Sequence, residues 1–294
     1  MFQAWRNIYS KSDNAKAYSL LSPALFLIIL VMLIPMALML SFSSFTQVSM
    51  MEIDFTPTIQ RYIDFFEKSL LVSLLIKSVK ISFIVTLITL LTAYPVCYYI
   101  AFYVKKNKML WSVLLTLPFW TSYLLRVFSW KIILGTKGVF NSTLLGAGII
   151  SEPLTFLMYS EEAVIITLTH AWAAFALLPL YVSLEKIDFS YIEAARDLGL
   201  SKFEVFWKVT FPLSLPGVIG AILIIFIPTV GDYVTPALIG GTEGRMLSNM
   251  IQAYFGKINN IPLGAASATI MLTTVILITA IVSYTTKRLT QRLS

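Results

Sequence analysis

The chain of 294 residues has few of the residues on which many soluble enzymes depend. It holds one cysteine, Cys97, so neither an internal disulfide nor a cluster of thiolates is expected. Its one histidine, His170, has no histidine, cysteine or carboxylate at metal-ligand spacing, and no metal site is expected. The phosphate-binding pattern Gly-x-x-x-x-Gly-Lys-Ser/Thr is also absent, which excludes ATP binding by that route.

Charge is scarce as well. Only 13% of the residues are charged, against about a quarter in soluble domains, while 57% are hydrophobic. The mean hydropathy is +0.81. A soluble fold of this size cannot bury so much apolar surface, whereas a bilayer accepts apolar helices of about 20 residues. The composition therefore predicts an all-α membrane protein that crosses the bilayer several times.

Six apolar runs are long enough to cross, and we expect a bundle of six transmembrane helices. The runs are Tyr18 to Phe42, Ile81 to Tyr103, Met109 to Leu134, Ala163 to Leu184, Leu213 to Ile239 and Leu263 to Tyr284. The first run follows three basic residues and lacks a clear small-residue cleavage site. We therefore interpret it as a retained helix and not as a removed signal peptide.

The distribution of Lys and Arg predicts the orientation. The net charge is +7, yet no basic stripe suggests a nucleic-acid partner. Thirteen of the 22 basic residues fall in the segments that are internal when the N-terminus is inside. Because cytoplasmic loops are enriched in Lys and Arg, both termini are expected in the cytoplasm. The expected parts are a cytoplasmic segment 1–17, a lipid-embedded domain 18–284 and a basic cytoplasmic tail 285–294.

The longest internal polar segment, residues 185–212, has the pattern of two short helices. Ser190 and Glu193 are spaced as a capping box, and Gly199 can take the left-handed conformation that ends a helix. A loop that only connected two spans would need about two to eight residues. The length and pattern therefore indicate a functional part.

The second half of this segment repeats the pattern. Ser201 and Glu204 form a second capping box, and Pro212 bounds the segment before the next span. Two short amphipathic helices are thus expected to meet at Gly199. Their apolar faces need either a protein partner or the surface of the bilayer, and the pattern alone leaves both open.

Part of this segment resembles a known motif. Glu193-Ala-Ala, Gly199 and Val209-Thr-Phe-Pro212 are similar to the EAA loop of ABC-importer membrane subunits. That pattern is Glu-Ala-Ala, three residues, Gly, nine residues, and Ile-x-Leu-Pro, and the spacing matches throughout with two apolar exchanges. In that family the loop docks on the ATPase. The resemblance implies that the ATPase contacts are Glu193, Ala194, Ala195 and Gly199.

Further segments resemble permeases of spermidine/putrescine-type importers. They are Leu117 to Arg126, Gly138 to Asn141, Leu178 to Asp188 and Gly231 to Gly241. The resemblance implies a MetI-like ABC permease fold in the bacterial inner membrane and a subunit that is not itself an enzyme. It also implies three partners: a second homologous permease, an ATP-binding cassette ATPase dimer that hydrolyses ATP, and an extracytoplasmic solute-binding protein. No cofactor is implied for this chain.

Asp232 is the first candidate for the solute path, because a charge at membrane depth is costly and usually functional. It lies between Pro228 and Pro236 and follows Gly231, so the helix is expected to be interrupted there. With the ring of Tyr233, its carboxylate could hold an ammonium group. The alternative is that Asp232 lies at the outer end of the fifth span in water.

Aromatic residues in or near the spans complete the candidate path. With Asp232, the side chains of Trp120, Tyr123, Trp130 and Trp172 could attract cations without trapping them. The alternative for each is an anchor at the bilayer interface.

Three other functions remain as alternatives. An ABC permease for another small cationic or organic solute would share much of this pattern. A self-sufficient secondary transporter is disfavoured because no inverted halves with matching broken helices are present. A membrane-embedded enzyme is disfavoured because no paired intramembrane carboxylates and no histidine cluster are available.

Overall fold

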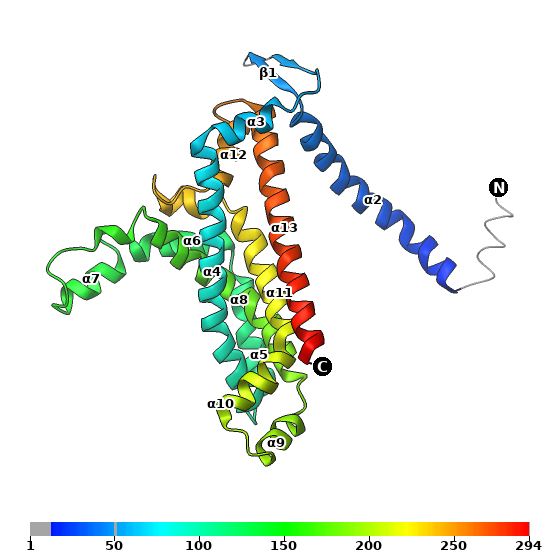
Figure 1. Ribbon diagram of the computed structural model, residues 1–294. Coiled ribbons are helices and arrows are strands. Elements are labelled where there is room, and N and C mark those ends of the chain that lie inside the picture. The colour runs from blue at the N-terminus through cyan, green and yellow to red at the C-terminus, as the bar shows by residue number, and fades with distance from the viewer. Residues whose placement is uncertain (1–12, 50–51, 294) are drawn as a thin grey trace.

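The structure is a computed structural model that describes residues 13–49 and 52–293 (Figure 1). Most of the expected N-terminal segment 1–17 lies outside the described residues. The long helices are α2 (Asp13–Phe42), α4 (Ser69–Phe102), α8 (Glu161–Glu185), α11 (Phe211–Val230) and α13 (Ile261–Leu293). The shorter helices are α3 (Gln60–Glu67), α5 (Lys108–Thr116), α6 (Tyr123–Leu134), α7 (Val139–Gly146), α9 (Phe189–Asp197), α10 (Lys202–Val205) and α12 (Leu247–Phe255).

The remaining elements are short. Two strands, β1 (Thr46–Ser49) and β2 (Glu52–Asp54), pair antiparallel as a hairpin with an irregular register between Gln47 and Ser49. Two 3₁₀ turns are η1 (Leu117–Trp120) and η2 (Thr155–Leu157), and two π-helical turns are η3 (Phe206–Thr210) and η4 (Pro236–Gly240). The hairpin, α3 and α12 lie at one end of the molecule, which we call the hairpin end (Figure 1). The opposite end, formed by α9 and α10, is the α9 end.

The main core lies between α4, α8 and α11, which run side by side (Figure 1). Val85, Leu168 and Ile225 are completely buried there. Cys97 is buried in the same core, and its thiol donates to the carbonyl of Leu177 at 3.3 Å. The cysteine is thus part of the packing between helices.

The outside of the bundle is apolar. Exposed side chains on its surface include Leu91, Tyr99 and Ile276, and five described helices are long and apolar enough to cross a membrane. One of them, α2, extends away from the bundle after meeting α13 near the hairpin end (Figure 1). An apolar exterior of this kind suits lipid as the solvent, because lipid tails accept apolar side chains.

The third expected span, Met109 to Leu134, is wrong as a single helix. The chain instead forms α5, the turn η1 and then α6, so the helix is interrupted. The turn contains Pro118, which has no N–H to donate to a helix. From α6 the chain continues into α7, and both project sideways from the bundle (Figure 1).

Other expected boundaries also shift. α4 begins 12 residues before the expected Ile81, and its 34 residues make it roughly 51 Å long, more than the hydrocarbon thickness of about 30 Å. The added part includes Lys77, which donates to the carbonyl of Glu243 at 2.7 Å, and Lys80, which pairs with Glu161 at 2.9 Å. Both lysine side chains of this added part therefore have partners from distant segments of the chain.

The C-terminal end also differs from a separate tail. α13 continues to Leu293, so the expected tail 285–294 is helical as far as the structure describes it. Arg288 lies within that helical extension, over the ring of Tyr284 at 4.8 Å from its centroid.

α8 and α11 approach each other closely at Gly217. A Cβ atom there would lie 2.3 Å from the Cβ of Ser183 and 2.6 Å from the carbonyl oxygen of Pro179. The Ser183 hydroxyl accepts from the N–H of Gly217 at 3.2 Å and donates to the carbonyl of Ser214 at 3.3 Å. The absence of a side chain therefore lets the two helices approach and hydrogen-bond.

We predict that Gly217→Ala destabilises the fold by about 1–3 kcal/mol, because overpacking outweighs the higher helix propensity of alanine. Gly220→Ala is the matched control in the same helix, since its Cβ would lie 3.5 Å from the Cβ of Pro179, an ordinary contact. Thermal unfolding of the purified variants in detergent should show a lower midpoint for Gly217→Ala only. Equal midpoints for the two variants would contradict this account of the crossing.

Candidate functional site

The segment between α8 and α11 contains α9 and α10, as the sequence predicts, but the first cap differs. α9 is capped by Asp188, whose carboxylate accepts from the backbone N–H of Ser190 at 3.0 Å. The predicted capping box of Ser190 and Glu193 is therefore wrong. That N–H holds the pKa of the exposed Asp188 carboxyl below its usual value. Aspartate is a strong N-cap, and Asp188 begins the helix two residues before the predicted cap at Ser190.

Gly199 ends α9 as the sequence predicts. Its φ is +83°, in the left-handed region that favours glycine. The N–H of Gly199 bonds to the carbonyl of Arg196 at 2.8 Å, and the N–H of Leu200 bonds to that of Ala195 at 3.2 Å. This pair of hydrogen bonds is a Schellman motif, which closes the helix and turns the chain toward α10.

The second predicted capping box is confirmed, and the helix that it begins is longer than expected. Ser201 and Glu204 bond reciprocally at the start of α10. Pro212, however, does not end this segment, because α10, η3 and α11 follow one another without a break. The wider π-helical turn η3 ends at Thr210, two residues before Pro212, and accommodates a proline that cannot donate the usual helical hydrogen bond. α9 is therefore joined to a continuous rod that extends through the bundle.

The four residues that the EAA resemblance singles out differ in exposure. Glu193, Ala194 and Gly199 are exposed. Ala195 is 6% exposed and packs with Ile192 and Val205 in a small core between α9 and α10. Ala195 thus faces the chain's own rod and not the surface.

Five large apolar side chains of α9, of the turn after it, of α10 and of η3 are also exposed. They are Phe189, Tyr191, Leu198, Phe203 and Trp207. Glu193 makes no ion pair within the part of the chain that the structure describes. We call this surface of α9 and α10 the coupling face.

Asp232 lies at a second interruption, between α11 and η4, as predicted. Its side chain is only 8% exposed in this structure. One carboxylate oxygen accepts from the hydroxyl of Tyr123 at 2.5 Å, and the other accepts from the N–H of Val234 at 3.0 Å. The Tyr123 oxygen is also 2.6 Å from the hydroxyl of Thr235. We call Tyr123, Asp232 and Thr235 the clasp.

Side chains from α12 support the same interruption. The Ser248 hydroxyl donates to the carbonyl of Asp232 at 2.6 Å, and the Asn249 amide donates to that of Tyr233 at 2.7 Å. Ser248, Asn249 and Thr235 could not be identified from the sequence. Each bonds to a residue at least 16 positions away, and no local pattern reveals such a contact.

The clasp lies near the middle of the bundle. The Tyr123 ring packs against that of Trp172, with centroids 6.0 Å apart. Trp172 is 11 residues from the start of α8 and 13 from its end, or roughly 16 and 20 Å along the helix. The clasp therefore joins the start of α6 to the end of α11 at mid-depth, where discontinuous helices commonly form solute sites.

Not all of the predicted path residues belong to this cluster. Tyr123, Trp172 and Asp232 come together, and Tyr233 follows Asp232 with its side chain 45% exposed. Trp120 is 86% exposed, and Trp130 packs edge-on against His170 at 5.4 Å. The buried Arg126 donates to the carbonyl of Ala171 at 2.7 Å and so joins α6 to α8.

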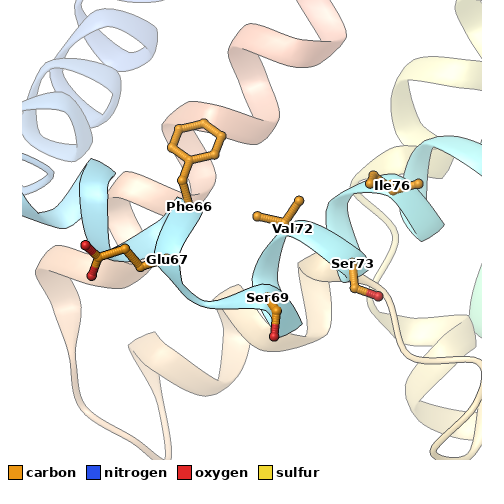
Figure 2. Close-up of a pocket in the computed structure, with 6 residues that line it drawn as sticks. All are labelled: Phe66, Glu67, Ser69, Val72, Ser73 and Ile76. Atoms are coloured by element: carbon orange, nitrogen blue, oxygen red, sulfur yellow. The ribbon is translucent and has the colours of Figure 1, made fainter.

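A hollow of about 390 Å³ lies elsewhere, where α3 meets α4 at the hairpin end (Figure 2). Figure 2 shows its lining residues Phe66, Glu67, Ser69, Val72, Ser73 and Ile76. It shares none of them with the clasp or with the coupling face. The hollow is therefore a separate feature of the hairpin end.

Comparison with known proteins places these features in a family. Residues 19–294 match the family model of the binding-protein-dependent transport system inner membrane component. The chain is 36% identical over 265 residues to the spermidine/putrescine transport system permease protein PotB of Haemophilus influenzae, covering 90% of this chain and 92% of that protein. It is 38% identical over 215 residues to the PotB of Escherichia coli, covering 73% of this chain and 78% of that protein.

A solved structure has the same fold. The crystal structure of a bacterial ABC transporter involved in the import of the acidic polysaccharide alginate matches with a TM-score of 0.73. The match covers 97% of this chain and 99% of that one at 14% sequence identity. At this identity the likeness concerns the fold alone.

We predict that Gly199→Val loosens the turn between α9 and α10, because a β-branched residue is strained at φ +83°. A Cβ there would meet no atom within 4 Å, so backbone strain alone is tested. Gly199→Asn is the matched control, since asparagine tolerates the left-handed region. Hydrogen exchange of the α9 amides should accelerate at least severalfold in Gly199→Val and little in Gly199→Asn. Equal exchange in both variants and the wild type would contradict the role of this φ angle.

Proposed function

Since this chain belongs to the family of binding-protein-dependent transport system inner membrane components, we propose that it forms the translocation path of an importer for polyamines. Spermidine and putrescine are the solutes in the name of the PotB relatives. The likeness to PotB extends over 92% of the Haemophilus protein, which supports a shared solute class. In this proposal the chain is a permease subunit and does not catalyse a reaction.

The observation that carries the solute class is the clasp. A buried carboxylate at mid-depth has aromatic neighbours and no ion-pair partner among the described residues. A protonated amine would supply the missing positive charge, and the ring of Tyr123, Trp172 or Tyr233 would attract it further. The fold alone does not select the solute, because a transporter of the same fold imports an acidic polysaccharide.

We further propose that the coupling face binds the ATPase. It combines the exposed Glu193, Ala194 and Gly199 with exposed apolar side chains, and a protein partner would bury these. Ala195 would act from inside by holding α9 against α10. Because α10 continues into α11, a movement of the ATPase would reach the interruption at Asp232 through one rod.

The family supports the remaining partners, and the positions of the basic residues support the orientation. A second permease would complete the path, an external binding protein would deliver the solute, and the ATPase would hydrolyse ATP. The α9 end carries Lys186, Arg196, Lys202 and Lys208, which supports a cytoplasmic position for that end. The hairpin end would then face outward, and both termini would lie on the cytoplasmic side of the inner membrane.

We predict ATP-dependent uptake of labelled spermidine or putrescine into vesicles that contain the complete reconstituted complex. Vesicles that lack only this chain should show no uptake, because the path would be incomplete. A complex that assembles and hydrolyses ATP but transports neither amine would contradict the polyamine assignment and leave the family unaffected.

We predict that Asp232→Asn lowers spermidine uptake about tenfold or more. Asparagine keeps the size and an acceptor oxygen but has no charge to attract an ammonium group, and interactions with a charged group are worth about 1.5–3 kcal/mol. Glu152→Gln is the matched control, since Glu152 is an exposed acid outside the clasp. Equal uptake by the Asp232→Asn and wild-type complexes would remove Asp232 from the path.

A further inference from the structure

The hydrogen bonds of the clasp have a fixed direction. Tyr123 has one hydroxyl proton, and an ionised Asp232 can only accept, so that proton points to the carboxylate. The contact between Tyr123 and Thr235 must then be donated by the threonine. Protons therefore point from Thr235 to Tyr123 and from Tyr123 to Asp232. Thr235 is fully buried, so no solvent competes for this arrangement.

This arrangement satisfies Asp232 without a cation. Two neutral donors, the Tyr123 hydroxyl and the Val234 N–H, occupy its two carboxylate oxygens. Arg126 is buried on the same helix as Tyr123, yet its Nη1 bonds to the carbonyl of Ala171. Both carboxylate oxygens are thus hydrogen-bonded in the empty path by groups that carry no positive charge.

We propose that Tyr123 is a positioning residue that occupies Asp232 in the empty path and is displaced by a protonated amine of the solute. This inference rests on the proposed function. The phenol and the ammonium group compete for the same carboxylate oxygen, so the clasp weakens solute binding. The Val234 N–H remains on the other oxygen and keeps the carboxylate in place.

Displacement would also change the contacts between helices. The Tyr123–Asp232 bond joins the interrupted third span to the interrupted fifth span. An amine that took over Asp232 would remove this bond, and the Tyr123 ring would lose its fixed place against Trp172. The solute would therefore stabilise an arrangement of α6 and α11 different from that of the empty protein, as a transported solute must.

The test is direct binding of tritiated spermidine to the complex of this permease, its companion permease and the ATPase in nanodiscs, without the binding protein. Tyr123→Phe keeps the ring and removes the competing donor. It should bind spermidine about tenfold more tightly than the wild type, equivalent to about 1.4 kcal/mol, while maximal uptake falls. Thr235→Val, which removes only the donor to the phenol, should give a smaller gain.

Controls separate this effect from a structural one. Tyr99→Phe removes a hydroxyl from an exposed tyrosine of α4 and should leave binding unchanged. A purely structural role for Tyr123 would instead weaken spermidine binding in Tyr123→Phe.

The outcomes separate this inference from the proposed function. Unchanged or weaker binding by both Tyr123→Phe and Thr235→Val, with uptake intact in the wild type, would overturn the competition alone. Undetectable binding in all of these complexes would also overturn it, because freeing the carboxylate should reveal the site. A wild-type complex that takes up no polyamine would remove both the solute assignment and this inference.

Discussion

Backbone N–H and C=O groups cannot be left unpaired inside a bilayer, and the rest of this structure depends on how one interruption meets that constraint. Between α11 and η4 the Asp232 side chain accepts from Val234, while Ser248 and Asn249 donate to the carbonyls of Asp232 and Tyr233. Three side chains thus replace helical hydrogen bonds that the break removes. The helix of the fifth span can therefore end at mid-depth, and the break places the Asp232 carboxylate inside the bundle.

The same rod that ends at this interruption begins at the coupling face. A π-helical turn carries it past Pro212, and the Schellman motif at Gly199 joins it to α9. Rigid helices transmit displacement over distance, whereas a flexible loop would absorb it. The close contact of Gly217 with Ser183 and Pro179 holds the rod against α8 between the coupling face and the clasp. A shift of α9 relative to α8 must therefore be accommodated at this crossing.

Features that depend on local sequence could be predicted, and those that depend on distant partners could not. The positive φ of Gly199, the Ser201 capping box and the break after Gly231 follow from residues within a few positions. The early part of α4 includes Lys77, which contacts Glu243 at a separation of 166 residues, and the buried Asp232 is bonded by Tyr123 at a separation of 109 residues. The predicted Ser190 cap was wrong although the information is local, because Asp188, two residues earlier, is also a strong N-cap and begins the helix.

A transport site must bind its solute well enough to admit it and weakly enough to release it. An unoccupied carboxylate at mid-depth would be costly in the empty protein and would hold an ammonium group strongly once paired. Two neutral donors reduce both problems, because they stabilise the charge before the solute arrives and must be partly displaced when it binds. A lysine or arginine partner would stabilise Asp232 more strongly, but it would also cancel the charge that attracts a cation. A phenol that donates one hydrogen bond leaves that charge in place, and this makes tyrosine a suitable residue to occupy a cation site between transport cycles.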